Sequence, residues 1–377
     1  MKLIKGYKIL TLIVIVSLML TGCTDNRHLK DLAIVEGIAI DRQGDEISLH
    51  LQTLNVGISN SSETPQGNMT INTADKGKSL NSAIVNISAS LSKRIFFGQN
   101  KLIILGRGLA DKDFKKELDY LLRSTDSRAD IAVCMASDKA EDIIKSKEND
   151  TAVPCENMLY LINNSEKSGL SVLVTASDLL NIYNDKTSDL FLPVLKIEKG
   201  EKSVSTDGIA LFSGNSLSYI TSREETQGFV LLIGDINNMI IEVEDSKLGR
   251  IGLKLSRIKC KKRASIINKH VVLSAKITGD MLINEIENGI DITLDKQDHE
   301  RIKKLADQKL CLLMSNAFLA CKRAKSDSIR LGEQLACNDT DAYRTMSNSW
   351  NDEFLKAEIA AQSDISVKKI SDNTQVE

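Results

Sequence analysis

The pattern of apolar and polar positions in the first part of the chain predicts strands interleaved with helices. The apolar run 32–41 contains Gly37 and is typical of a buried strand. Residues 46–56 alternate with period two, as a half-buried strand does, so the two segments form a predicted hairpin. From residue 78 the apolar positions recur every three or four residues, which predicts an amphipathic helix over 78–92.

The same two periods continue to about residue 198. They predict strands and helices in turn, the strands at 69–74, 101–106, 129–137 and 191–198 and the helices near 110–124, 139–147, 156–167 and 176–184. We therefore expect a mixed α/β region over 23–195. The polar stretch 199–206 is typical of a linker.

The second half of the chain has a strand-rich pattern that ends in helices. Strand-like segments lie at 207–214, 216–221, 228–234, 239–245, 249–268 and 270–282. One long helix follows over 295–325, with an apolar stripe that must pack on the sheet. Shorter helices at 329–336 and 341–357 and a strand at 363–370 complete the pattern. This order predicts an α+β domain over 203–377, with an antiparallel sheet packed by the long helix.

The chain begins with the features of a secretory leader. Lys2, Lys5 and Lys8 precede an apolar run of twelve residues, 9–20, and no acidic residue lies among them. A membrane-spanning helix needs about 20 apolar residues, so this run is short for one. Leu20-Thr21-Gly22-Cys23 follows, a lipobox in which small residues fit a peptidase and the cysteine thiol accepts diacylglycerol.

Cleavage is therefore expected between Gly22 and Cys23, with residues 1–22 as the signal peptide. The diacylglyceryl group on Cys23 supplies two acyl chains, which is enough for stable attachment to a membrane. The body of the protein would then lie outside the cytoplasm, held by lipid rather than by polypeptide.

Charge and composition narrow the classes of function. Removing the leader takes away three lysines and no acid, which leaves 46 basic and 51 acidic residues. This balance gives no electrostatic footprint for nucleic acid. Aromatic residues make up only 4% of the chain, fewer than pockets that stack sugars or flat cofactors use. The six cysteines after Cys23 are scattered, and no C-x-x-C motif occurs.

The candidate catalytic motifs are incomplete. Gly106-x-Gly108 follows a predicted strand, but Asp111 replaces the third small residue of a dinucleotide-binding turn, and an acid there would repel a pyrophosphate. We read Asp111 instead as a residue at the start of a helix. None of the four histidines lies within four positions of another or of a cysteine, so no metal-ligand spacing exists. The sequence therefore predicts a non-enzymatic protein without a catalytic, cofactor or metal site.

The densest basic run is KCKKR at 259–263. Such a run can contact anionic lipid head groups or an acidic partner. A short run of this kind is more often the solvated face of a strand.

Several separated segments together resemble the Ger(x)C family of spore-germination lipoproteins. The segment 22–41 resembles the family's opening, in which a Gly-Cys pair leads into an apolar strand that ends Gly-Ile-Gly-Ile-Asp; the matching strand end here includes Gly37, Ile38, Ile40 and Asp41. Thr24 stands where the family has tryptophan, and Ala39 where it has glycine. Similar stretches follow in order at 93–110, 119–145, 161–169, 207–241 and 347–370, the last through Trp350 and Phe354.

This resemblance implies an elongated, multi-domain α+β lipoprotein that is a subunit of a nutrient germinant receptor. The family fold has three domains, which implies that the region 23–195 is divided once internally and is followed by the domain 203–377. Its partners would be a large membrane subunit and a multi-spanning, transporter-like subunit in the spore inner membrane. Cys23 matches the lipidated cysteine of the family. The alternative is a solute-binding lipoprotein of a transporter, for which two similar lobes around a hinge and an aromatic-rich pocket are expected.

Overall fold

The structure is a computed structural model that describes residues 31–55, 69–124, 128–146, 153–185, 187–198, 203–234, 236–288 and 294–368. The leader and the lipobox, with Gly22 and Cys23, lie outside the described residues. Among the helices that are described, none has both the length and the apolar character needed to cross a bilayer.

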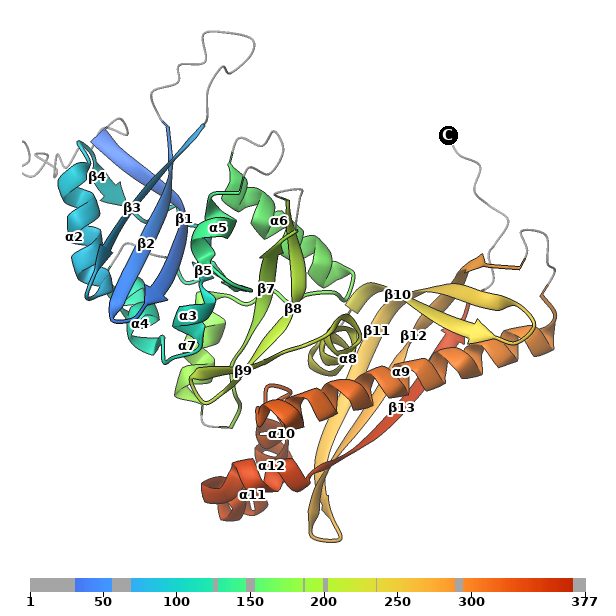
Figure 1. Cartoon of the computed structure of the whole chain (residues 1–377). Helices are drawn as coiled ribbons and strands as arrows, with labels where there is room; N and C mark the ends of the chain where they lie inside the picture. Colours follow the sequence, from blue (N-terminus) through green and yellow to red (C-terminus); the bar gives the residue numbers. More distant parts are fainter. Residues whose placement is uncertain are drawn as a thin grey trace, which may run out of the picture.

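A large mixed sheet organises the first part of the described chain (Figure 1). Its strand order is β3-β2-β1-β5-β6-β7-β8-β9, and the short β4 pairs with β1. Strands β1, β5, β6 and β7 are mutually parallel, and the strands toward both edges run antiparallel. The strands are β1 Leu32–Gln43, β2 Glu46–Leu54, β3 Thr70–Gly77, β4 Arg94–Phe96, β5 Leu102–Leu105, β6 Ala132–Ala136, β7 Phe191–Ile197, β8 Val204–Ser213 and β9 Ser216–Ile220. Because β8 and β9 extend this sheet, it crosses the predicted boundary at residue 203.

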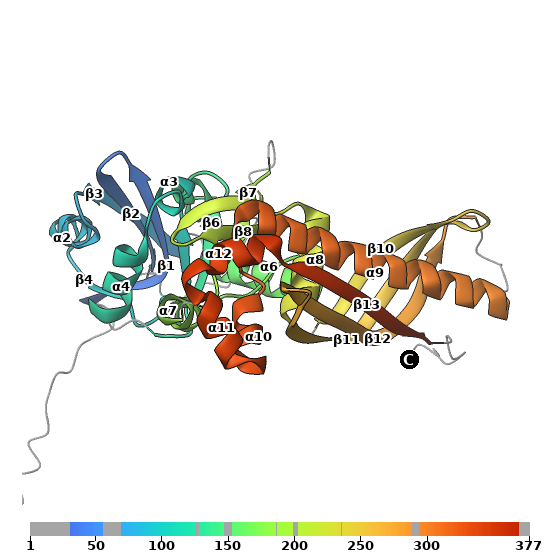
Figure 2. The ribbon, with the colours of Figure 1, turned by 90° about the horizontal axis from the view of Figure 1, so that it is seen from below.

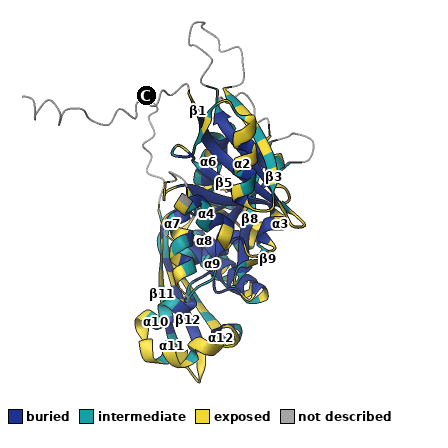
Figure 3. Cartoon of the chain, turned by 90° about the vertical axis from the view of Figure 1, so that its left-hand side faces the viewer, coloured by how far each residue is buried: buried dark blue, intermediate teal, exposed yellow. Residues whose placement is uncertain are grey.

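Helices cover both faces of the large sheet, which explains why its central strands are almost continuously apolar. Alternate residues of β5 enter two different cores: Ile103 and Leu105 join one, and Leu102 and Ile104 join the other. The first core receives α2 Leu80–Ser90, α3 Arg107–Ala110, α4 Lys115–Ser124 and α7 Ala176–Asn184. The second receives α5 Ala140–Ile144 and α6 Pro154–Lys167. Figure 3 shows these strands buried between helices whose outer faces are exposed.

The second sheet has the order β10-β11-β12-β13, with strands at Ile236–Asp245, Gly249–Ile267, His270–Ile286 and Glu358–Val367. The first three strands are antiparallel, as predicted, but β13 joins β12 in parallel, so the sheet is mixed. The helix α9, Lys296–Ala324, lies between β12 and β13 along the chain. It carries the chain back along the sheet, so that β13 can run parallel to β12. It lies lengthwise on the sheet, with Leu310, Leu313 and Ala317 buried (Figures 1 and 2).

The segment predicted as a strand at 228–234 is instead the helix α8, Arg223–Ile233. Ser222 and Glu225 form a capping box that starts it. All residues from Thr226 to Leu232 are buried because α8 packs between the large sheet and α9. A helix that is buried all round has no polar stripe, so its apolar run looks like a buried strand in the sequence.

The helix predicted over 341–357 is three short elements. These are α11 Thr340–Met346, the 3₁₀ turn η2 Ser347–Ser349 and α12 Trp350–Lys356, preceded by α10 Leu331–Asn338. Serine and asparagine in 347–349 favour local side-chain bonds over a continuous helix, and Ser347 and Ser349 each donate to a carbonyl three residues back. The last strand therefore starts at residue 358 rather than 363.

Candidate functional site

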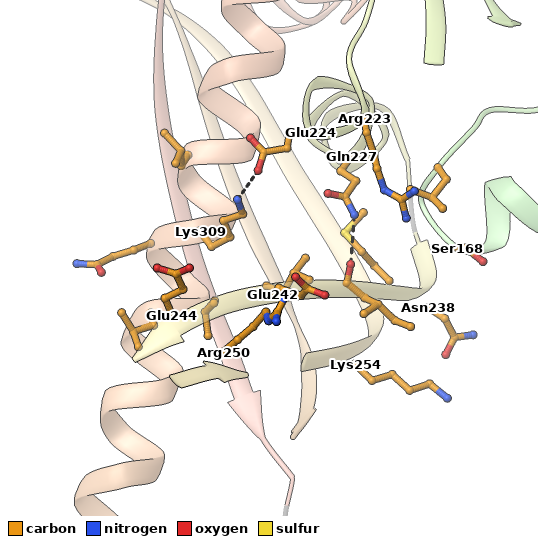
Figure 4. A pocket seen from close by; sticks show the side chains of 18 residues that line it. Ser168, Arg223, Glu224, Gln227, Asn238, Glu242, Glu244, Arg250, Lys254 and Lys309 are labelled. Carbon is orange, nitrogen blue, oxygen red and sulfur yellow. Dashed lines mark hydrogen bonds and ion pairs between the residues drawn. The ribbon is translucent and has the colours of Figure 1, made fainter. Parts of the chain in front are cut away.

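A groove of about 970 Å³ runs along β10, between this strand and the helices α8 and α9 (Figure 4). Its apolar part includes Ile240, which is 60% exposed, and Leu312 on α9, which is 52% exposed. The residues of β10 alternate between buried and exposed, so Ile240 lies on the solvent side while Met239 and Ile241 enter the core. A pair of large exposed apolar side chains in a concave surface is typical of a binding site.

The rim of the groove carries charges of both signs. Glu224 of α8 accepts a hydrogen bond from Lys309 of α9 at 2.6 Å, which ties the two helices together at one wall. Figure 4 shows Glu242 and Glu244 on β10 and Arg250 and Lys254 on β11 around the same space. Polar residues around an apolar centre give a site orientation and specificity.

β10 is an open edge of the second sheet, whereas the opposite edge is covered. At β13, the Asp307 carboxylate of α9 accepts from the Ile365 backbone N–H at 3.1 Å, and the Cys311 thiol donates to the Ala361 carbonyl at 3.5 Å. At β10, the Gln227 amide donates to the Ile240 carbonyl at 3.2 Å. This bond shows that the even-numbered residues of β10 direct their backbone groups away from β11, because the N–H and C=O of one residue point to the same edge.

Such an edge can accept another strand by backbone pairing. The outward N–H and C=O groups belong to Asn238, Ile240, Glu242 and Glu244, of which the Ile240 carbonyl already accepts from Gln227. The apolar side chains beside them would contact alternate side chains of an added segment. The alternation over 236–245 in the sequence was a signal of a half-exposed strand. That this strand is an edge, and that α8 and α9 form a groove with it, is not readable from the sequence.

A second polar centre joins the C-terminal helices to the large sheet. The Asp327 carboxylate, which is 1% exposed, accepts from the backbone N–H groups of Leu331 and Gly332 at 2.8 and 2.7 Å and from Trp350 Nε1 at 2.9 Å. It thereby satisfies the first N–H groups of α10 and fixes the start of α12. The backbone N–H of Asp327 in turn donates to Asp189, just before β7, at 2.8 Å. Burial raises the pKa of Asp327 to about 7.

The glycines of the incomplete dinucleotide motif have a structural explanation. A side chain at Gly106 would overlap the Asp41 carboxylate, and one at Gly108 would come within 2.7 Å of the Arg42 carbonyl oxygen. Both glycines are thus required where β1 passes close to the loop after β5. Asp111 does not start a helix as we predicted from the sequence: it ends the short α3.

The basic run at 259–263 lies on β11 and is divided between the two faces of the sheet. Lys259, Lys261 and Arg263 are exposed on one face. Lys262 points to the other face and donates to the Ile329 carbonyl at 3.1 Å, and burial lowers the pKa of its ammonium group. The interpretation of this run as the solvated face of a strand therefore holds for Lys259, Lys261 and Arg263 but not for Lys262.

Comparison with known proteins identifies the family. The family model of the spore germination protein N-terminal domain matches residues 25–197. The family model of the spore germination B3/GerAC-like C-terminal domain matches residues 207–371. The chain belongs to the Ger(x)C family of germinant receptor subunits. This confirms the resemblance found in the sequence.

Relatives of this Ger(x)C chain match it over nearly its whole length. Spore germination protein KC of Bacillus subtilis is 24% identical, over 90% of this chain and 89% of its own. Spore germination protein B3 of the same organism is 22% identical, over 95% of this chain and 96% of its own. The crystal structure of the GerBC protein superimposes with a TM-score of 0.59 at 18% identity, covering 88% of this chain and 97% of that one. The α+β, multi-domain fold class predicted from the sequence is confirmed.

Proposed function

We propose that this chain is a lipid-anchored, non-enzymatic subunit of a spore nutrient germinant receptor. It acts through protein contacts with the other receptor subunits at the spore inner membrane and so supports germination. Membership of the Ger(x)C family carries the receptor assignment. The lipobox at Leu20–Cys23 supports the anchor, and the open β10 edge supports action by protein contact.

Within this function we assign the β10 groove as the contact surface for another receptor subunit. The occupant that fits is an extended segment which adds as a strand to β10. Its backbone would pair with the outward groups of Asn238 to Glu244, its apolar side chains would cover Ile240 and Leu312, and its charges would meet the mixed-sign rim. The solute-binding alternative fits less well, since the two sheets differ in size and topology and do not form two similar lobes.

The anchor is tested by replacing its acceptor thiol. Cys23→Ser keeps the size of the side chain but removes the sulfur, so acylation should be lost and the protein should remain unprocessed or be released from the membrane. Metabolic labelling with palmitate followed by membrane fractionation measures both effects. Cys337→Ser, at an exposed cysteine far along the chain, is the matched control and should keep its label. Persistent label in Cys23→Ser would show that another group is acylated.

The groove is tested by a proline in β10. Glu242→Pro removes a backbone N–H that faces away from β11, so the fold should tolerate it, as edge strands do. An added strand would lose a hydrogen bond and meet the proline ring. We expect slower germination with the nutrients of this receptor, and loss of adducts from a photo-crosslinker placed at Ile240.

Glu242→Ala is the control for this test, because it removes the same carboxylate and keeps the N–H. A crosslinker at Val85, which is 57% exposed on α2, controls for chance proximity. If Glu242→Pro and Glu242→Ala behave alike, or if Val85 gives the same adducts as Ile240, strand addition at β10 is wrong. The receptor assignment would survive that result, because it depends on the family and not on the groove.

A further inference from the structure

The distal part of the β11–β12 hairpin extends beyond β10, while β13 accompanies β12 as far as Val272, close to the turn (Figure 1). The pairing of β10 with β11 stops at Ile258, and β11 continues with β12 to the pair Ile267 and His270. Asn268 and Lys269 form the turn, with φ angles of 51° and 68°, as a two-residue type I′ hairpin requires. The turn and the pairing of β11 with β12 therefore fix the position of the residues next to the turn.

One face of this hairpin carries a cluster of cations. Lys259, Lys261 and Arg263 alternate along β11 and are exposed, and Lys276 of β12 lies directly opposite Lys261. Among the described residues, none of these four has an ion-pair partner within 4.0 Å. Like charges that face each other across two strands oppose folding. The cluster therefore lowers stability unless something anionic covers it.

The acidic groups around the cluster do not neutralise it. The Asp280 carboxylate, further along β12, already forms ion pairs with Arg257 and, at 3.5 Å, with Lys368. Glu358, at the start of β13, lies beside Val272 in the register and is the nearest acid along that strand. Lys269 in the turn adds a further exposed cation. The end of the hairpin is thus basic in a chain whose formal net charge is −2.

Apolar side chains lie just before the polar turn. Ile266 is 39% exposed and Ile267 is 51% exposed, and they adjoin the turn. Successive side chains of a strand point to opposite faces, so Ile267 shares the face of Lys259, Lys261 and Arg263, and Ile266 lies on the other face. An exposed apolar side chain beside a row of cations suits a bilayer surface, where anionic phosphates lie outside and hydrocarbon below. An acidic protein would match the cations, but it would leave the exposed Ile267 unexplained.

We propose that the β11–β12 hairpin docks its basic face on an anionic lipid bilayer, with Ile267 entering the head-group region and the cations meeting lipid phosphates. Apolar insertion and attraction of basic residues to an anionic surface act together in such binding. This second contact would set the orientation of the body on the membrane. It does not depend on acylation of Cys23, which would only hold the chain nearby.

The experiment places a fluorescent reporter at the tip. The full chain with Ile267→Trp, carrying an N-terminal histidine tag, is held on vesicles by a nickel-chelating lipid, so that acylation is not needed. The vesicles contain brominated phosphatidylcholine, with or without phosphatidylglycerol. We expect a blue shift and strong quenching of the added tryptophan with phosphatidylglycerol and neither with phosphatidylcholine alone. The parent chain, whose single Trp350 is buried, supplies the background signal.

Two matched controls make the result specific. Leu312→Trp reports from a side chain of nearly equal exposure, 52% against 51%, in the β10 groove, and should show neither effect. In the Ile267→Trp chain, replacing the lysines of the cluster by glutamine should abolish the blue shift; these are Lys259, Lys261 and Lys276. The same replacement of three exposed lysines elsewhere should leave the shift unchanged; these are Lys112, Lys296 and Lys304. The shift should also weaken with added salt, which screens the attraction.

Three outcomes would overturn the proposal. The tip reporter could remain in water on phosphatidylglycerol vesicles, or it could respond no more than Leu312→Trp does. Alternatively, the cluster variant could slow germination while the tip reporter stays in water, in which case the basic face binds an acidic protein and not the bilayer.

Discussion

Replacing Asp327 by alanine should lower the free energy of unfolding by about 3 to 5 kcal/mol, because three buried donors lose their acceptor together. These donors are the backbone N–H groups of Leu331 and Gly332 and the indole N–H of Trp350. Asp327 is only 1% exposed, so its three donors are largely shielded from bulk water. Urea unfolding followed by circular dichroism measures the change.

The exposed Asp352, on the neighbouring α12, provides the control for Asp327. Asp352→Ala should change the free energy of unfolding by less than about 0.5 kcal/mol. Equal losses in the two variants would mean that the buried carboxylate does not hold α10 and α12 in place.

Asp327 should also make stability depend on pH in the direction opposite to most carboxylates. Burial raises its pKa to about 7 in the folded protein, from an ordinary value of 3.8. The folded protein therefore keeps this proton where the unfolded chain loses it, and stability from this residue falls as pH rises from about 4 to about 7. Asp327→Asn cannot ionise, so the advantage of the natural chain over this variant should be larger at pH 5 than at pH 8. An advantage that grows with pH would contradict the raised pKa.

Replacing Gly228 by leucine should cost about 3 kcal/mol or more, because α8 crosses α9 with its backbone in contact. A side chain at Gly228 would overlap the carbonyl group of Leu313 and would also reach within 2.9 Å of the Ala317 Cβ. A backbone carbonyl inside a helix cannot move aside, so the two helices must separate. Since α8 and α9 form one wall of the β10 groove, crosslinking from Ile240 should fall as well.

Gly234, at the end of the same helix, is the matched control for Gly228. No atom lies within 4 Å of a side chain added there, and its φ of −152° is open to any residue. Gly234→Leu should therefore leave the unfolding midpoint and the crosslinking nearly unchanged. If Gly228→Leu is equally harmless, the close crossing of α8 and α9 is wrong.

Most strands and helices could be predicted from the sequence because their periodicity records which faces are buried. The stripe that includes Leu310, Leu313 and Ala317 predicted α9 and its packing, and the alternation over 46–56 predicted β2. The pattern failed where burial is complete on all sides. The run that contains Phe229 and Leu231 was assigned to a strand, since a helix without a solvent face shows no period.

The candidate site depended on the tertiary structure much more than the elements did. Nothing local distinguishes β10, an open edge, from β13, whose edge α9 covers through Asp307. Asp327 lies in a polar stretch that is typical of an exposed turn, yet it is buried because residues near 189 and 350 close over it. The basic run 259–263 could be recognised as cationic, but not as one face of a hairpin with an apolar tip.

The sequence alone predicts the leader and the lipidation at Cys23, and it determined the order of most elements and the family, because each is encoded in neighbouring residues or in separated motifs that recur in order. The tertiary structure alone decided which strand edge stays open, which glycine lies at a helix crossing and which carboxylate is buried. Those properties depend on contacts between residues up to 138 positions apart, such as Asp189 with Asp327. The local sequence pattern indicates that a side chain is buried, but only the tertiary fold determines which residues surround it.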